Sequence, residues 1–87
     1  MNTYIISYDL IESDNYLPLY EAIKSYYNWG RITESTWAIV TDQTATMVRD
    51  HLSLYMKPRD RIMVVKSAKV AAWSNVLANN DWVRDNI

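Results

Sequence analysis

The sequence contains no cysteine and no phenylalanine, and it has one glycine and two prolines among its 87 residues. Without cysteine, there is neither a disulfide framework nor a thiolate metal site. A single glycine leaves no glycine-rich loop for cradling phosphates, and few prolines argue against long linkers. No apolar run approaches the roughly 20 residues that a membrane-spanning helix needs. With no signal-peptide pattern, these absences predict a cytoplasmic protein without membrane contact.

Aromatic residues are abundant for so short a chain, which has seven tyrosines and four tryptophans and is 49% hydrophobic. The length predicts one domain, which buries only roughly 60–65% of its unfolded surface. Each aromatic side chain can bury about 150–250 Å², so leaving several exposed would forgo much stabilisation. This favours a homodimer or another obligate contact.

The net charge of −1 hides an uneven distribution. Residues 57–69 carry five cations against one carboxylate, a balance of +4, which leaves −5 for the remainder. Such a stripe is compatible with a nucleic-acid backbone, and a solvated rim around an edge strand explains it about as well. The predicted nucleic-acid-binding residues are Arg31, Lys57, Arg59, Arg61 and Lys66, with Lys69 extending the stripe.

The first predicted strand, Thr3 to Asp9, ends in a carboxylate and is apolar on both faces, so both faces are expected to be covered. A helix follows, capped by Asp14 or Asn15, with Pro18 in its first turn and its end at about Tyr27. Gly30 is expected to stop this helix as a left-handed residue.

The β-prone run from 31 to 41 is too long for an average strand and is split near Glu34 and Ser35. Thr44 is expected to cap a second helix over residues 45–55, before Pro58. A last strand is predicted over 60–66, with Ile62 and Val64 opposite Met63 and Val65. The tail is predicted to form helical turns over 70–77 and a capped helix over 80–86.

The resulting order is the split β-α-β-β-α-β plan of a ferredoxin-like α+β fold, with two helices on one face of an antiparallel sheet. We expect a single domain over residues 1–87, with a core over 1–66 and a C-terminal helical tail over 67–87. Because the main strands are apolar on both sides, the second face must be covered by the tail, by a second subunit, or by both.

The segments Thr3-Tyr4-Ile5-Ile6-Ser7-Tyr8-Asp9 and Ser35-Thr36-Trp37-Ala38-Ile39 resemble two strands of the small ferredoxin-like CRISPR-associated endoribonucleases. They are also similar to the endoribonuclease antitoxins of type V toxin–antitoxin pairs, in the run from Asn2 to Asp9. The resemblance covers roughly residues 1–66. It departs in the first helix, where the CRISPR-associated family is basic and this chain offers only Lys24.

The resemblance implies a homodimer in which Asp9 faces its symmetry mate. The two carboxylates would then share Mg²⁺, which takes one or two carboxylates plus waters and phosphate oxygens. Asp9 is therefore the candidate catalytic and metal-binding residue. The alternative is that Asp9 caps the following loop or pairs with Arg31 or Arg61.

Ser7, Ser35 and Thr36 could contact phosphate, although strand hydroxyls more often pair across the ladder. His51 has no nearby ligand cluster and is expected to face solvent. Trp37, Trp73 and Trp82 are the predicted interface residues, since tryptophan is a frequent anchor at interfaces, and Trp73 and Trp82 are expected to dock the tail.

Two functions follow from these residues. The first is a Mg²⁺-dependent endoribonuclease, or a protein that binds RNA or DNA, acting through Asp9 and the basic residues. The alternative is a non-enzymatic dimeric adaptor that binds a protein partner through its sheet face and tail.

Overall fold

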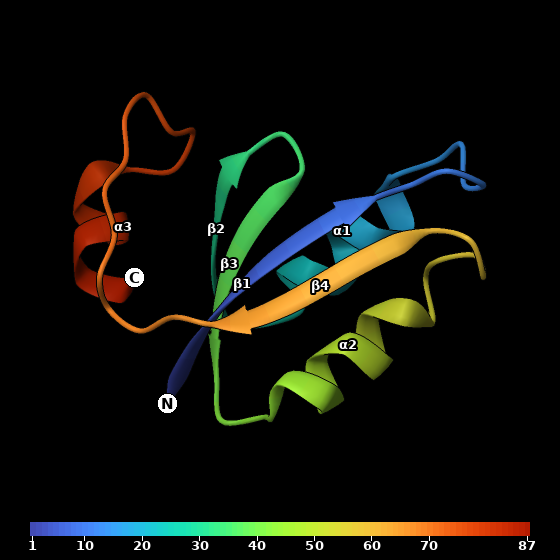
Figure 1. The fold of residues 1–87 in the computed structure, drawn as a ribbon, viewed down its shortest axis with the longest axis horizontal. Coiled ribbons are helices and arrows are strands. Elements are labelled where there is room, and N and C mark those ends of the chain that lie inside the picture. The colour runs from blue at the N-terminus through green and yellow to red at the C-terminus, as the bar shows by residue number, and fades with distance from the viewer.

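The computed structural model describes residues 1–87 as a four-stranded antiparallel sheet with three helices (Figure 1). In chain order the elements are β1 (Asn2–Asp9), α1 (Leu17–Lys24), β2 (Asn28–Thr33), β3 (Thr36–Thr41), α2 (Ala45–Ser53), β4 (Arg61–Lys66) and α3 (Asn80–Asn86). The α+β class is confirmed. No helix is both long enough and apolar enough to cross a bilayer.

The sheet has the order β2-β3-β1-β4, so β1 lies inside it and pairs with both β3 and β4. Ile5 lies opposite Ala38 on one side and opposite Val65 on the other, while Ile6 lies opposite Trp37 and Val64. Because residues directly opposite one another share a face, β1 separates two apolar faces, as its alternation predicts.

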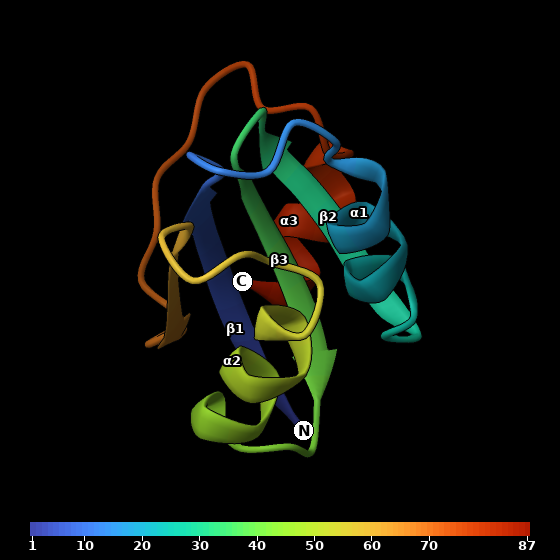
Figure 2. The same cartoon turned by 90° about the vertical axis from the view of Figure 1, so that its right-hand side faces the viewer.

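The two predicted long helices, α1 and α2, lie together on one face of the sheet, which we call the helix face (Figure 2). Their buried side chains meet the strands in one core cluster, in which Ile6, Leu19, Ile23 and Leu52 are fully buried. The hydroxyl of Thr44 accepts a hydrogen bond from the backbone N–H of Met47, so the predicted N-cap of α2 is confirmed.

The helices are shorter than the sequence predicts. α1 ends at Lys24 instead of about Tyr27, and the Tyr27 side chain is fully exposed. α2 ends at Ser53, before Tyr55. The chain leaves α1 early because Asn28 already belongs to β2, so the connection is too short for another helical turn.

Gly30 does not stop a helix, contrary to the prediction. It lies inside β2, and no glycine has a positive φ. A Cβ atom at Gly30 would come within 2.6 Å of Cζ3 of Trp82. Gly30 is therefore required by the close approach of the α3 tryptophan, not by a left-handed turn.

The tail crosses to the second face of the sheet, which we call the open face, and α3 covers part of it (Figures 1 and 2). The predicted helical turns over 70–77 do not form, and α3 is the only helix after β4. The α3 helix itself is confirmed, and Asn79 caps it by accepting hydrogen bonds from the backbone N–H groups of Asp81 and Trp82.

Candidate functional site

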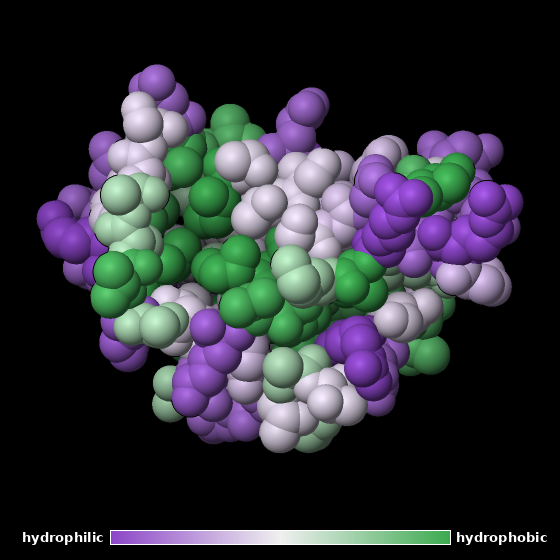
Figure 3. Space-filling view, viewed as in Figure 1, coloured by the Kyte–Doolittle hydropathy of each residue, from purple (hydrophilic) through white to green (hydrophobic).

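The tail covers only half of the open face. Over β2 and β3, Trp82 lies against Gly30, and Ala38 and Val83 are buried. Over β1 and β4, by contrast, Met63 is 61% exposed and Val65 is 47% exposed. We call this second region the uncovered half-face, and it consists of the exposed residues Ser7, Asp9, Arg61, Met63 and Val65. Figure 3, which has the view of Figure 1 with β4 in front, shows apolar surface across the middle of the molecule and hydrophilic surface on both flanks.

Asp9 ends β1 at one edge of the uncovered half-face and lies directly opposite Arg61 of β4. The Nη1 atom of Arg61 lies 3.2 Å from Oδ2 of Asp9, and their side chains are 72% and 64% exposed. The alternative of an ion pair with Arg61 is therefore what forms within one chain, and Arg31 is not its partner. An exposed pair of this kind contributes only about 0–1 kcal/mol, so another ligand can replace it at little cost.

No group of three or more histidine, aspartate and glutamate side chains lies close enough together to hold a metal ion. Asp9 contributes a single carboxylate, and its Oδ1 atom has no hydrogen-bond partner in the chain. The donor set of one chain fits a hard cation only if a second carboxylate comes from elsewhere, because Mg²⁺ is usually held by one or two carboxylates plus waters and phosphate.

Hydroxyl groups lie next to Asp9 on the same face. Ser7 is exposed and lies opposite Thr36 in the β1–β3 ladder, and neither hydroxyl forms a hydrogen bond within the chain, so both are available to a ligand beside Asp9. Ser35 lies apart from them, because it lines a hollow with Tyr16 and Tyr20, and its carbonyl oxygen accepts the backbone N–H of Tyr8.

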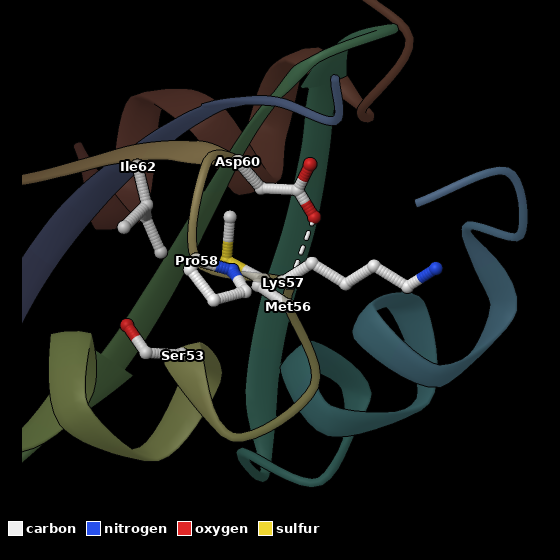
Figure 4. Close-up of a pocket in the computed structure, with 6 residues that line it drawn as sticks. All are labelled: Ser53, Met56, Lys57, Pro58, Asp60 and Ile62. Carbon is white, nitrogen blue, oxygen red and sulfur yellow. Dashed lines mark hydrogen bonds between the residues drawn. The ribbon is translucent and has the colours of Figure 1, made fainter. Parts of the chain in front are cut away.

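The basic stripe runs along β4 and the loop before it. Lys57, Arg59, Arg61 and Lys66 are all exposed. Lys57 and Arg59 use their backbone N–H groups to bond Asp60 and Glu12, which leaves their cationic ends free. In Figure 4 the Lys57 side chain extends away from the hollow of about 270 Å³ that Ser53, Met56 and Ile62 line between α2 and β4. The stripe is therefore a rim of exposed cations, not a pocket.

Asp60 anchors the loop between β1 and α1 to this rim, a role that no pattern in the sequence indicated. Its carboxylate accepts hydrogen bonds from the N–H groups of Ile11, Glu12 and Ser13, from the Ser13 hydroxyl and from the N–H of Lys57. Partial loss of water acts to raise the pKa of Asp60, but these hydrogen bonds outweigh it and hold that pKa well below its usual value. Asp60 is thus a fully engaged structural carboxylate, not a second metal ligand.

Arg31 lies on the helix face of β2, away from the other predicted nucleic-acid-binding residues. Its guanidinium carbon lies 4.8 Å from the ring centre of Tyr20 and 5.1 Å from that of Trp37. It donates to the Tyr20 hydroxyl at 3.0 Å and to the carbonyl of Glu34 at 2.8 Å, and it has no carboxylate partner. The buried Nε atom has no hydrogen-bond partner.

A hollow of about 220 Å³ opens beside Arg31, between Tyr16, Tyr20, Glu34 and Ser35. Tyr16 is 40% exposed, and its ring centre lies 5.8 Å from that of Tyr20. The spacing of four residues between these tyrosines could have indicated a shared helical face. Their position over Arg31 depends on the packing of α1 against β2 and had no signal in the sequence.

Two of the predicted positions are corrected by burial. Trp37 is only 1% exposed and donates its indole N–H to the Tyr8 hydroxyl, so it belongs to the core and not to an interface. His51 does not face solvent freely, because its Nδ1 atom lies 2.8 Å from the hydroxyl of buried Tyr26. Burial raises the pKa of Tyr26, so its hydroxyl keeps its proton.

The two tail tryptophans differ in their packing. Trp82 docks the tail as predicted, since its ring lies against Gly30 and its indole N–H donates to Asn28 at 2.8 Å. Trp73 remains 39% exposed and donates to Asn80 at 3.3 Å, within the tail itself. Of the three tryptophans predicted as interface residues, Trp73 is therefore the one that remains available in the folded chain.

No protein-family model matches this sequence, and no solved structure gives a significant match to it.

Proposed function

We propose that this protein is a homodimeric, ferredoxin-like endoribonuclease that uses Mg²⁺ held between the Asp9 carboxylates of two copies. The observation that carries the proposal is Asp9 itself. It is an exposed carboxylate at the end of an interior strand, and only its Oδ2 atom is paired, with Arg61. Hydroxyl groups without hydrogen-bond partners lie on the same face. The element order and the placement of α1 and α2 on one face support the ferredoxin-like arrangement.

The uncovered half-face supports the homodimer. Its exposed apolar side chains, Met63 and Val65, lie on the face that carries Asp9. A second copy that packs on this face by two-fold symmetry therefore places both Asp9 residues at the interface between the copies. Removing Met63 and Val65 from water also supplies apolar burial that one chain lacks.

The protein groups have separate roles in this proposal. Arg61 leaves Asp9 and binds the phosphate group of the RNA, while Ser7 and Thr36 donate hydrogen bonds to its oxygens. Lys57, Arg59 and Lys66 hold the flanking backbone. Arg31 has no role at this site, because its guanidinium lies on the other face of the sheet, against Tyr20 and Trp37. Mg²⁺, when bound, would activate water and stabilise charge at the phosphorus. No histidine takes part.

Cleavage of a mixed RNA pool tests the proposal. We expect Mg²⁺-dependent cleavage by the wild type and a loss of at least about 100-fold in Asp9→Asn, because a neutral amide is a poor ligand for a hard cation. Asp85→Asn is the matched control, since Asp85 is also exposed and paired with an adjacent arginine. Equal cleavage by wild type and Asp9→Asn would remove Asp9 from the mechanism.

A second candidate is the non-enzymatic adaptor, and a specific observation favours it. Exposed apolar side chains extend beyond the uncovered half-face onto the tail, where Val70 is 92% exposed and Trp73 is 39% exposed. A protein partner accounts for such a surface better than RNA does.

A further inference from the structure

The two edges of the sheet are protected differently. At the β2 edge, the carbonyl of Ile32 accepts a hydrogen bond from the N–H of Leu77 at 2.9 Å, so the tail lies along that strand. β4 forms the opposite edge and pairs only with β1. An unprotected edge strand is a template for a further strand.

The backbone groups that point outward from β4 follow from its ladder. The N–H of Ser67 donates to the carbonyl of Thr3, and residues alternate in direction along a strand. Arg61, Met63 and Val65 therefore direct their N–H and C=O groups toward β1, while Ile62, Val64 and Lys66 direct theirs away from the sheet. None of these three residues forms a hydrogen bond outside the β1–β4 ladder.

We propose that the β4 edge binds an extended peptide segment of a partner protein, with an apolar centre and acidic flanks, as a fifth strand of the sheet. The three outward residues offer alternating donors and acceptors, which a peptide strand satisfies and a phosphate backbone, rich in acceptors only, does not. Side chains of the added strand that point to the open face extend the apolar surface of Met63 and Val65.

The positive charge at both ends of the β4 edge favours a peptide with acidic residues on both sides of its apolar centre. The edge begins at Arg61, after Lys57 and Arg59, and ends at Lys66, before Lys69. The nearby carboxylates Asp60, Glu12 and Asp9 reduce this charge without pairing with most of it. Only Arg61 forms an ion pair, with Asp9, so the other cations of the edge are open to an acidic ligand. A second copy at this edge would place two segments of +4 one strand spacing apart, about 4.8 Å, whereas sheets packed face to face lie about 10 Å apart. Charge therefore disfavours a second copy at the edge more than one on the uncovered half-face.

The probe is a short labelled peptide with alternating valine and threonine in its centre and two glutamates at each end. We expect binding, measured by fluorescence anisotropy, to weaken as salt is raised. The matched peptide is methylated on alternate backbone nitrogens, which keeps its charge but removes its strand pairing. Its affinity should fall at least about tenfold, because several hydrogen bonds are lost together.

Val64→Pro is the first protein variant. It removes an outward N–H without touching the β1 ladder, and proline is tolerated at such edge positions. We expect it to lose peptide binding while keeping a wild-type circular dichroism spectrum. If it fails to fold, the methylated peptide on the wild-type protein still decides the matter. Lys66→Glu should weaken binding several-fold, while Lys24→Glu, on α1, should not.

Three results would overturn the proposal. Equal binding of the plain and methylated peptides would mean that charge alone attracts the peptide. A wild-type dimer that becomes a monomer in Val64→Pro, by sedimentation, would make a second copy the occupant of the edge. Binding of a single-stranded RNA but of neither peptide, abolished by Lys66→Glu, would assign the stripe to nucleic acid. None of these depends on Asp9, so failure here is separate from failure of the RNA-cleavage proposal.

Discussion

The two halves of the open face are made by neighbouring strands, but the side chains of one half are packed against the tail and those of the other are exposed to solvent. Over β2 and β3 the strands present Gly30 and Ala38, which are small enough for α3 to approach and for Trp82 and Val83 to pack. Over β1 and β4 they present Ser7, Asp9, Arg61, Met63 and Val65, which the tail does not cover. The first half is built for internal packing, and the second keeps charge, hydroxyls and apolar surface available to another molecule.

The largest effect that distinguishes the two halves is expected at Gly30. In Gly30→Ala, the added Cβ atom would meet the ring of Trp82 at 2.6 Å, so α3 must shift or undock. We expect a loss of about 2 kcal/mol in the free energy of unfolding, measured by urea denaturation, as for other overpacked sites.

A double-mutant cycle gives the control for this prediction. In a Trp82→Ala background the ring is absent, so Gly30→Ala should cost much less there than in the wild type. The same cost in both backgrounds would mean that strain in β2, and not contact with α3, requires the glycine.

The next effect concerns Asp60, at the start of β4, and it depends on pH. The pKa of Asp60 is lowered in the folded state, so its contribution to stability is present above the unfolded pKa of about 3.9 and is lost as the pH falls below that value. Asp60→Asn should therefore lower the urea midpoint at pH 7, and the difference from wild type should shrink at pH 3. Asp50→Asn, with an exposed carboxylate paired to Arg49, should show neither change. A gap that is constant from pH 7 to pH 3 would exclude the charge of Asp60 as the cause.

The smallest effect on stability is expected on the uncovered half-face. Met63→Ser changes an exposed side chain, so the free energy of unfolding of one chain should change by no more than about 0.5 kcal/mol. If the proposed homodimer forms here, the same change should raise its dissociation constant, measured by sedimentation equilibrium. A loss of more than about 2 kcal/mol in the monomer would show that Met63 supports the fold of a single chain.

Local sequence signals predicted much of the fold. The alternation over Thr3 to Asp9 and the Thr44 cap both depend on neighbouring residues, and each corresponds to an element in the structure. The predicted cap of α1 at Asp14 or Asn15 was wrong, because Tyr16 occupies that position and its side chain makes no capping hydrogen bond. The apolar residues on both faces of the strands predicted that a second layer would cover the open face, and the tail partly provides it. The end of α1 and the role of Gly30 were predicted wrongly, because both depend on residues distant in the chain.

For the candidate site, the sequence by itself determined that Asp9 ends an apolar strand and that cations concentrate over residues 57–69. Only the tertiary structure decided that Asp9 lies opposite Arg61, that Arg31 lies apart on Tyr20, and that Trp37 is buried. The physical reason is that side-chain alternation is a local property, whereas strand register, sheet order and the path of the tail arise from contacts between residues far apart in sequence.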